Sequence, residues 1–101
     1  MEPKSQSKLS NLRECYICGS RYNLEIHHIF FGNPNRNFSD EDGMWCYLCS
    51  ECHRGTYGVH GKKGERNNDY LKRRAQMKWE KAYGDTEAFI ERYGRSYLID
   101  D

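Results

Sequence analysis

Four of the five cysteines in this 101-residue chain stand in two Cys-x-x-Cys pairs, with thirty residues between the pairs. The pairs are Cys15 with Cys18 and Cys49 with Cys52. A tight turn over such a pair directs two sulfurs to one ion, and two turns complete the tetrahedron of a structural zinc site. Because four thiolates leave no open position on the ion, we expect this zinc to stabilise the fold, by on the order of 10 kcal/mol, and to do no chemistry.

The same cysteines are compatible with other chemistry. Two disulfides would also join them, although the polar N-terminus has no secretory signal that would place the chain in an oxidising compartment. Cys49-Ser-Glu-Cys52-His53 matches a haem-attachment motif, and Cys46 extends a run that resembles part of an iron–sulfur motif without its fourth cysteine. A thioredoxin-like pair would need a βαβ pattern. We prefer zinc, with Cys46 as a buried strand thiol.

All four histidines lie between the two cysteine pairs or just after the second pair. His27 and His28 are neighbours on an expected strand, so their side chains should point to opposite faces and have different roles. His53 directly follows the second pair, and His60 comes soon after it. Three imidazoles could hold a divalent ion, and one held free of the metal could take a proton from water. The alternative for each histidine is simple packing or hydrogen bonding, and their clustering favours a site.

The elements that must position these side chains follow from apolar patterning and turn residues. An alternating run predicts a strand over 24–31, and an aromatic run predicts a second strand over 44–49, so that a hairpin joins the cysteine pairs. Residues 32–43 are rich in turn formers and predict a loop. A short helix should open at Cys52. The chain is too short for two domains.

Two further helices, one long and one short, are expected in the C-terminal part. The long helix spans 68–83 and the short one 87–93, and an apolar tail at 97–99 should dock on the core. Asn67, Asn68 or Asp69 should cap the start of the long helix, and Gly84 should end it. Asp85 or Thr86 should cap the start of the short helix, and Gly94 should end it. Residues 1–12 are polar and predict a flexible lead-in to a single domain over 13–101.

Charge is segregated along the chain. The mean hydropathy is −1.05 and 31% of residues are charged, which excludes a membrane span. Residues 62–81 carry eight basic and three acidic groups, whereas residues 84–101 carry two basic and five acidic groups. A basic helix of this kind is either a contact surface for a polyanion or a solvated helix face.

The combined string of Cys-x-x-Cys, Ile-His-His-Ile and Leu-Cys-x-x-Cys-His resembles the HNH endonuclease family, whose core is the ββα-metal fold. The resemblance covers residues 13–64, and residues 65–101 would add the C-terminal helices. Arg54-Gly55, Val59-His60-Gly61 and the basic helix are similar to small HNH proteins of phages and prophages. The resemblance therefore implies an α+β fold with a zinc-stabilised ββα-metal core.

The resemblance also implies roles for individual residues. His27 and His53 would bind a catalytic metal, His60 would be a further ligand, and His28 would be the general base. The middle Asn of the family falls near Gly43 or Met44, where this chain has none. Asn35, which precedes Arg36, is our candidate for its replacement, and ordinary turn chemistry is the alternative.

The implied activity is metal-dependent hydrolysis of DNA phosphodiester bonds, leaving 5′-phosphate and 3′-hydroxyl ends. Mg²⁺ or Mn²⁺ would serve as the catalytic ion, and imidazole ligands would also suit Zn²⁺ or Ni²⁺. Arg36 would reach the scissile phosphate, and the DNA backbone would be met by Lys72, Arg73 and Lys78. The alternative is a non-catalytic zinc-stabilised module that binds nucleic acid or assists a phage packaging machine. In either case we expect no membrane partner and a place in the cytoplasm of a bacterium or of a phage-infected host.

Overall fold

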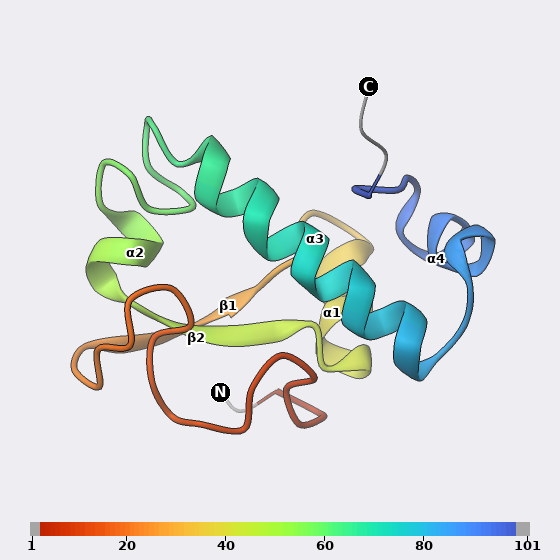
Figure 1. The fold of residues 1–101 in the computed structure, drawn as a ribbon, viewed down its shortest axis with the longest axis horizontal. Helices are drawn as coiled ribbons and strands as arrows, with labels where there is room; N and C mark the ends of the chain where they lie inside the picture. Colours follow the sequence, from red (N-terminus) through yellow and green to blue (C-terminus); the bar gives the residue numbers. More distant parts are fainter. Residues whose placement is uncertain (1–2, 99–101) are drawn as a thin grey trace.

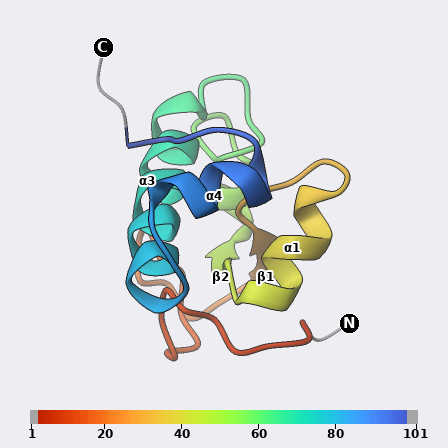
Figure 2. The same cartoon turned by 90° about the vertical axis from the view of Figure 1, so that its right-hand side faces the viewer.

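The computed structural model describes residues 3–98 and has an α+β fold. The chain forms β1 (Leu24–His28), α1 (Asn35–Asp42), β2 (Trp45–Cys49), α2 (Ser50–Arg54), α3 (Glu65–Ala82) and α4 (Thr86–Tyr93), in this order (Figure 1). In the view of Figure 2, α3 and α1 lie on opposite sides of the strands and α4 bridges them. No helix in this described part of the chain combines the length and the apolar character needed to cross a bilayer.

The two strands pair antiparallel and form the hairpin expected from the sequence. His27 lies opposite Cys46 and His28 lies opposite Trp45. β1 is three residues shorter than predicted, because the chain turns after His28 to bury Ile29 and Phe30 in the core. The strand therefore ends at its two histidines, and the two residues that follow them belong to the core.

The prediction of a loop over 32–43 is wrong, because this segment contains the helix α1. No side chain caps the start of α1, so local sequence gives little reason for a helix there. The fold stabilises it instead. Ser39 is fully buried, and its hydroxyl donates to the carbonyl of Phe30 and accepts from the Phe30 amide. Gly43 then ends the helix in the left-handed region, at φ 75°.

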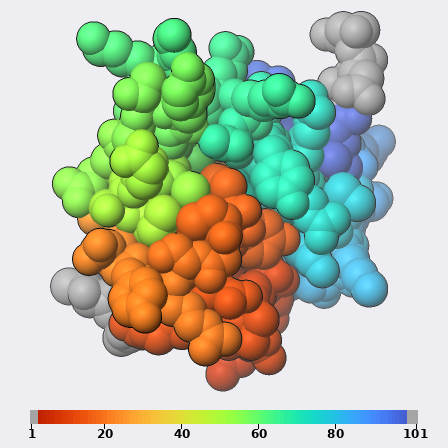
Figure 3. All heavy atoms as spheres, turned by 60° about the vertical axis from the view of Figure 1, so that its left-hand side comes forward, coloured from red at the N-terminus to blue at the C-terminus, as the bar shows by residue number. Residues whose placement is uncertain are grey.

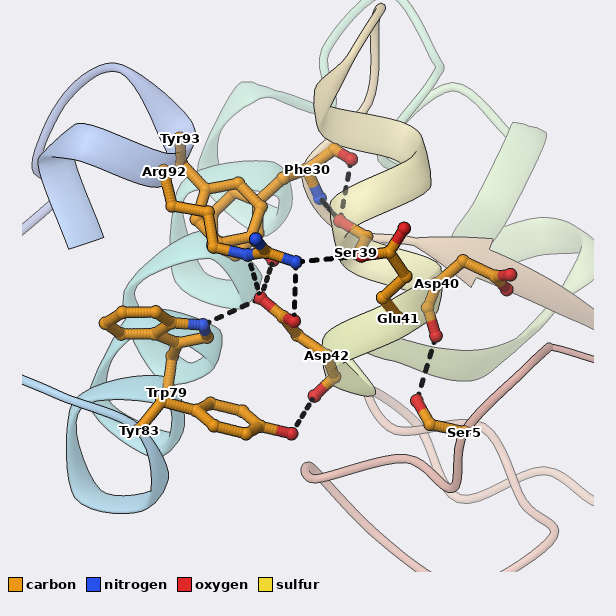
Figure 4. Close-up of polar contacts among 10 residues, drawn as sticks. All are labelled: Ser5, Phe30, Ser39, Asp40, Glu41, Asp42, Trp79, Tyr83, Arg92 and Tyr93. Atoms are coloured by element: carbon orange, nitrogen blue, oxygen red, sulfur yellow. Dashed lines mark hydrogen bonds and ion pairs between the residues drawn. The ribbon is translucent and has the colours of Figure 1, made fainter. Parts of the chain in front are cut away.

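The last residue of α1, Asp42, joins three helices through its buried carboxylate (Figure 4). One oxygen, Oδ2, accepts hydrogen bonds from Trp79 Nε1 at 2.8 Å, Tyr93 Oη at 2.8 Å and Arg92 Nε at 2.6 Å. The other oxygen accepts from Arg92 Nη2 at 2.8 Å. The backbone carbonyl of Asp42 accepts from Tyr83. A buried carboxylate needs this degree of pairing, and the pairing fixes α1 against α3 and α4.

The long helix α3 begins earlier than predicted and is capped by Gly64 rather than by an Asn or Asp side chain. The capping candidates Asn67, Asn68 and Asp69 lie inside its first turns. Gly64 packs so closely on Gly58 that an added Cβ would lie 1.7 Å from the Gly58 carbonyl oxygen. The start of α3 is therefore set by tertiary packing. Its C-cap is Tyr83, one residue before the predicted Gly84.

The short helix α4 follows the prediction. Asp85 is its N-cap and accepts a hydrogen bond from the Ala88 amide, and Gly94 closes it in the left-handed region at φ 99°. Tyr97 then packs its ring on Phe30 and Phe89, as expected of a docking tail. Ile99, the end of that predicted tail, lies outside the described residues.

The N-terminal segment differs from the expected flexible lead-in, since it lies against β2 and the end of α1. The Lys8 amide donates to the Gly43 carbonyl at 2.8 Å, and Trp45 Nε1 donates to the Ser5 carbonyl at 2.9 Å. Leu9 is 7% exposed and belongs to the core. The buried Leu9 and these hydrogen bonds thus hold a segment that its composition alone predicts to be flexible. Residues 1–2 lie outside the described part.

Candidate metal centres

The two cysteine pairs meet at one point, as their spacing predicts. Cys15 and Cys18 lie in a turn before β1, in which Gly19 takes φ 80° and its amide donates to the Cys15 carbonyl. Cys49 ends β2 and caps α2, so that Cys52 lies one turn into that helix. The four sulfur atoms all lie within 4.8 Å of one another. This group could bind a zinc ion.

The ionisation of these thiols fits a cation at their centre. Although burial opposes it, the backbone amides around Cys15, first that of Cys18, lower the pKa of Cys15 to about 7. Burial raises the pKa of the Cys52 thiol, and the neighbouring Cys49 and Cys15 raise it further. Four thiolates this close would repel one another strongly, and a divalent cation removes that cost by binding all four.

The fifth cysteine lies outside this group. Cys46 is the second residue of β2, lies opposite His27, belongs to the core and is 2% exposed. Burial raises the pKa of its thiol far above the usual range. The set of four is therefore Cys15, Cys18, Cys49 and Cys52, and not a run through Cys46. All five cysteines are free thiols.

Three of the four histidines form a second cluster. His27 comes from the end of β1, His53 from α2, and His60 from the loop after α2. Their ring centroids are 4.9–5.2 Å apart, and each offers a nitrogen within 4.8 Å of the others. The His60 amide donates to the His53 carbonyl at 3.0 Å, so the loop returns His60 to the helix despite the seven-residue spacing.

The chemistry of His27 fits a bound ion. Its side chain is 2% exposed, and its Nε2 atom has no hydrogen-bond partner among the described residues. A buried polar atom without a partner costs about 1–3 kcal/mol. Burial lowers the pKa of His27 to about 3, and electrostatic repulsion from the neighbouring imidazoles adds to this effect. The ring is therefore neutral at pH 7, which is the form that binds metals.

A carboxylate orients His53. Glu25 Oε1 lies 2.6 Å from His53 Nδ1, which leaves Nε2 as the nitrogen available for an ion. Arg54 donates to the same carboxylate, and the hydrogen bonds from His53 and Arg54 lower the pKa of Glu25. Glu25 is not among the site residues predicted from the sequence. The period of two along β1, which places it on the same face as His27, could have identified it.

His28 does not join the cluster around His27 but contacts a carboxylate, in line with the expectation that neighbours on a strand point to opposite faces. His28 Nε2 lies 3.0 Å from Asp40 Oδ1, and this hydrogen bond lowers the pKa of Asp40. Asp40 belongs to α1 and was also missed from the sequence, because the segment around it was predicted to be a loop. A carboxylate on one imidazole nitrogen fixes the tautomer and leaves the other nitrogen to accept a proton.

The three clustered histidines and His28 line one cleft of about 200 Å³. The cleft is lined by Ile26, His27, His28, Phe31, Arg36, His53 and His60. Arg36, for which the resemblance implies a contact with the scissile phosphate, is one of these lining residues. Asn35 is not among them: its Nδ2 donates to the Tyr93 carbonyl at 3.0 Å and ties α1 to α4.

The three predicted nucleic-acid contacts are distributed along α3. Lys72 is half-buried near the cleft, with Nζ 4.8 Å from the ring centroid of Phe31. Arg73 borders a separate small pocket, and Lys78 lies further along the helix.

The cysteine cluster and the histidine cluster are linked directly, since Cys52 and His53 are consecutive residues of α2. Figure 3 shows the face on which the segment around Cys15 adjoins α2 and the loop after it.

No model of a known protein family, no curated protein and no solved structure matches this chain.

Proposed function

We propose that the protein is a metal-dependent DNA endonuclease of the HNH type, which hydrolyses phosphodiester bonds. The observation that carries this proposal is that the cluster of three histidines and the separate His28 line the same cleft. His27, His53 and His60 offer nitrogens to one ion, and His28 lines the same cleft with a carboxylate on its far nitrogen. In this proposal β1, β2 and α2 form the ββα-metal unit.

His28 is the proposed general base. Asp40 holds Nε2, so Nδ1 is the atom that removes a proton from the attacking water. The carboxylate fixes the tautomer and stabilises the imidazolium that forms. Asp40 is thus the proposed positioning residue for His28.

His27, His53 and His60 are the proposed ligands of the catalytic ion, with Glu25 orienting His53. A divalent ion bound there would stabilise the negative charge that develops on the phosphate and on the leaving 3′ oxygen. Mg²⁺ and Mn²⁺ are the ions proposed first, and three imidazoles also suit Zn²⁺ and Ni²⁺. Arg36 lines the cleft, and its guanidinium would bind phosphate oxygens.

A second candidate is a zinc-stabilised module that binds nucleic acid, or assists a phage packaging machine, without turnover. The contact of His28 with Asp40 favours it, because an imidazole paired with a carboxylate also serves as a purely structural link between β1 and α1. In that case the four cysteines and the basic helix keep their roles, and the histidines stabilise the fold.

Plasmid cleavage separates the two candidates. Zinc-loaded protein should nick supercoiled plasmid when Mn²⁺ is added, and His28→Ala should reduce the rate at least about a hundredfold. Zinc content and the circular dichroism spectrum should be unchanged in the variant, since His28 is not a zinc ligand. A wild-type rate in His28→Ala would remove it as the base. A wild-type protein that cleaves nothing with Mg²⁺, Mn²⁺, Zn²⁺ or Ni²⁺ would favour the binding module.

A further inference from the structure

The segment after α4 is held against α3 by one buried side chain. Gln76 of α3 is fully buried, and its Nε2 donates to Ser96 Oγ at 3.0 Å. Its Oε1 accepts from the Tyr97 amide at 2.6 Å. Figure 2 shows this segment crossing beside α3. Arg95 and Tyr97 therefore have defined positions next to the helix.

This arrangement places alternating aromatic rings and cations in a row that starts at the cleft. Phe31 lines the cleft, with its ring centroid 5.4 Å from that of His60. Lys72 Nζ lies 4.8 Å from the Phe31 centroid and 5.1 Å from the Tyr97 centroid. The guanidinium of Arg95 lies 4.6 Å from the same Tyr97 ring. The rings hold both cations in place, so less side-chain freedom is lost when an anion binds.

Basic side chains predominate around this row in the part of the chain that the structure describes. Arg73 and Arg95 border a small pocket together with Asp69 and Tyr97, and Lys72 lies next to it on α3. Among the described residues that border this pocket, the two guanidinium groups of Arg73 and Arg95 outnumber the one carboxylate of Asp69. Since Lys72 and Arg95 both lie over the ring of Tyr97, that ring already has cation partners, and the site favours the anionic backbone of a nucleic acid over stacking of a base.

We propose that Lys72, Arg73 and Arg95 form a phosphate-binding site beside the cleft, which holds a backbone phosphate of the DNA strand that enters the cleft. The identity of the ligand as DNA rests on the proposed function, whereas the anion site rests on the row of cations and rings. Binding there is independent of base sequence and sensitive to salt. It extends the DNA contact from the basic helix to the segment after α4, where Arg95 lies.

Salt dependence of DNA binding tests the site. Fluorescence anisotropy would give the Kd for a fluorescein-labelled 16-base-pair duplex at several NaCl concentrations, with every variant carrying His28→Ala so that the DNA stays intact. Loss of one phosphate contact lowers the slope of log Kd against log salt by about 0.9. We expect this fall for Arg95→Gln and for Lys72→Gln. The matched control is Arg21→Gln, which removes an equal charge from a side chain that is 77% exposed and whose nearest carboxylate, Glu14, is 3.7 Å away.

The binding results test the phosphate site independently of whether the protein cleaves DNA. A slope that falls in Arg95→Gln and not in Arg21→Gln supports the site, even if the protein with His28 intact cleaves no plasmid and the nuclease proposal fails. Equal slopes for Arg95→Gln and Arg21→Gln overturn the site, even if plasmid cleavage is efficient. Failure of the duplex to bind at low salt overturns it as well.

Discussion

His27 and His28 are consecutive residues, yet they contact different groups. Successive side chains of a strand point to opposite faces, so His27 joins the imidazole cluster while His28 reaches the carboxylate of Asp40. Because β1 ends at these residues, both rings still line the same cleft. A pair of neighbouring histidines can thus supply one metal ligand and one base without competition between them for the ion.

Asp40→Asn tests the positioning of His28. The amide cannot stabilise the imidazolium as a carboxylate does and would allow the wrong tautomer, so kcat for plasmid cleavage should fall on the order of a hundredfold. The Kd for DNA should stay the same, since Asp40 lies behind His28. Glu41→Gln is the control, because Glu41 is the next residue of α1, is half-exposed and contacts Arg92 instead. Equal kcat values for the two variants would show that Asp40 has only a structural role.

At the scale of elements, α1 is the helix on which the site depends most and which its own sequence supports least. It supplies Asp40 to His28 and Arg36 to the cleft, although it has no capping side chain and no acidic residue in its first turn. Contacts distant in sequence stabilise it, above all those of Ser39 with Phe30 and of Asp42 with α3 and α4.

Replacement of Asp42 should therefore destabilise the whole fold. Asp42→Ala leaves the indole of Trp79, the hydroxyl of Tyr93 and the guanidinium of Arg92 without their acceptor. Loss of one partner from a buried ion pair costs about 3–5 kcal/mol, which is most of the stability of many small domains. Urea unfolding of zinc-loaded protein measures this, with the exposed α4 residue substitution Glu91→Gln as control. A difference below about 1 kcal/mol between the variants would contradict the structural role assigned to Asp42.

The features that sequence predicts well are those with a local cause. The Cys-x-x-Cys pairs, the alternation along β1 and the Asp85 and Gly94 caps of α4 each follow from residues a few positions apart. The features it misses depend on distant partners. α1 needs Phe30 and the C-terminal helices, and the start of α3 needs the close approach of Gly64 to Gly58. Asp40 was missed for the same reason, since its role requires α1 to exist.

At the scale of the whole molecule, the four cysteines connect three parts of a chain with a small core. Cys15 and Cys18 belong to the turn before β1, Cys49 to the end of β2, and Cys52 to α2. α2 also carries His53, so an ion on the cysteines would set the position of the histidine cluster. A small polar chain of this length would gain much of its stability from such an ion.

Removal of one zinc ligand should therefore affect both the fold and the second cluster. Cys52→Ala should lose the bound zinc and a large part of the roughly 10 kcal/mol that a structural site contributes, so the variant should be largely unfolded by circular dichroism. Cys46→Ala is the matched control, because that thiol is buried on the core side of β2 and should leave one cysteine-bound zinc per chain with a folded spectrum. Zinc content by mass spectrometry checks both expectations. Retention of zinc and fold in Cys52→Ala would contradict the ligand set, because the three remaining sulfurs would then suffice to hold the ion. Loss of zinc in a folded Cys46→Ala would also contradict it, because Cys46 itself would then be a ligand.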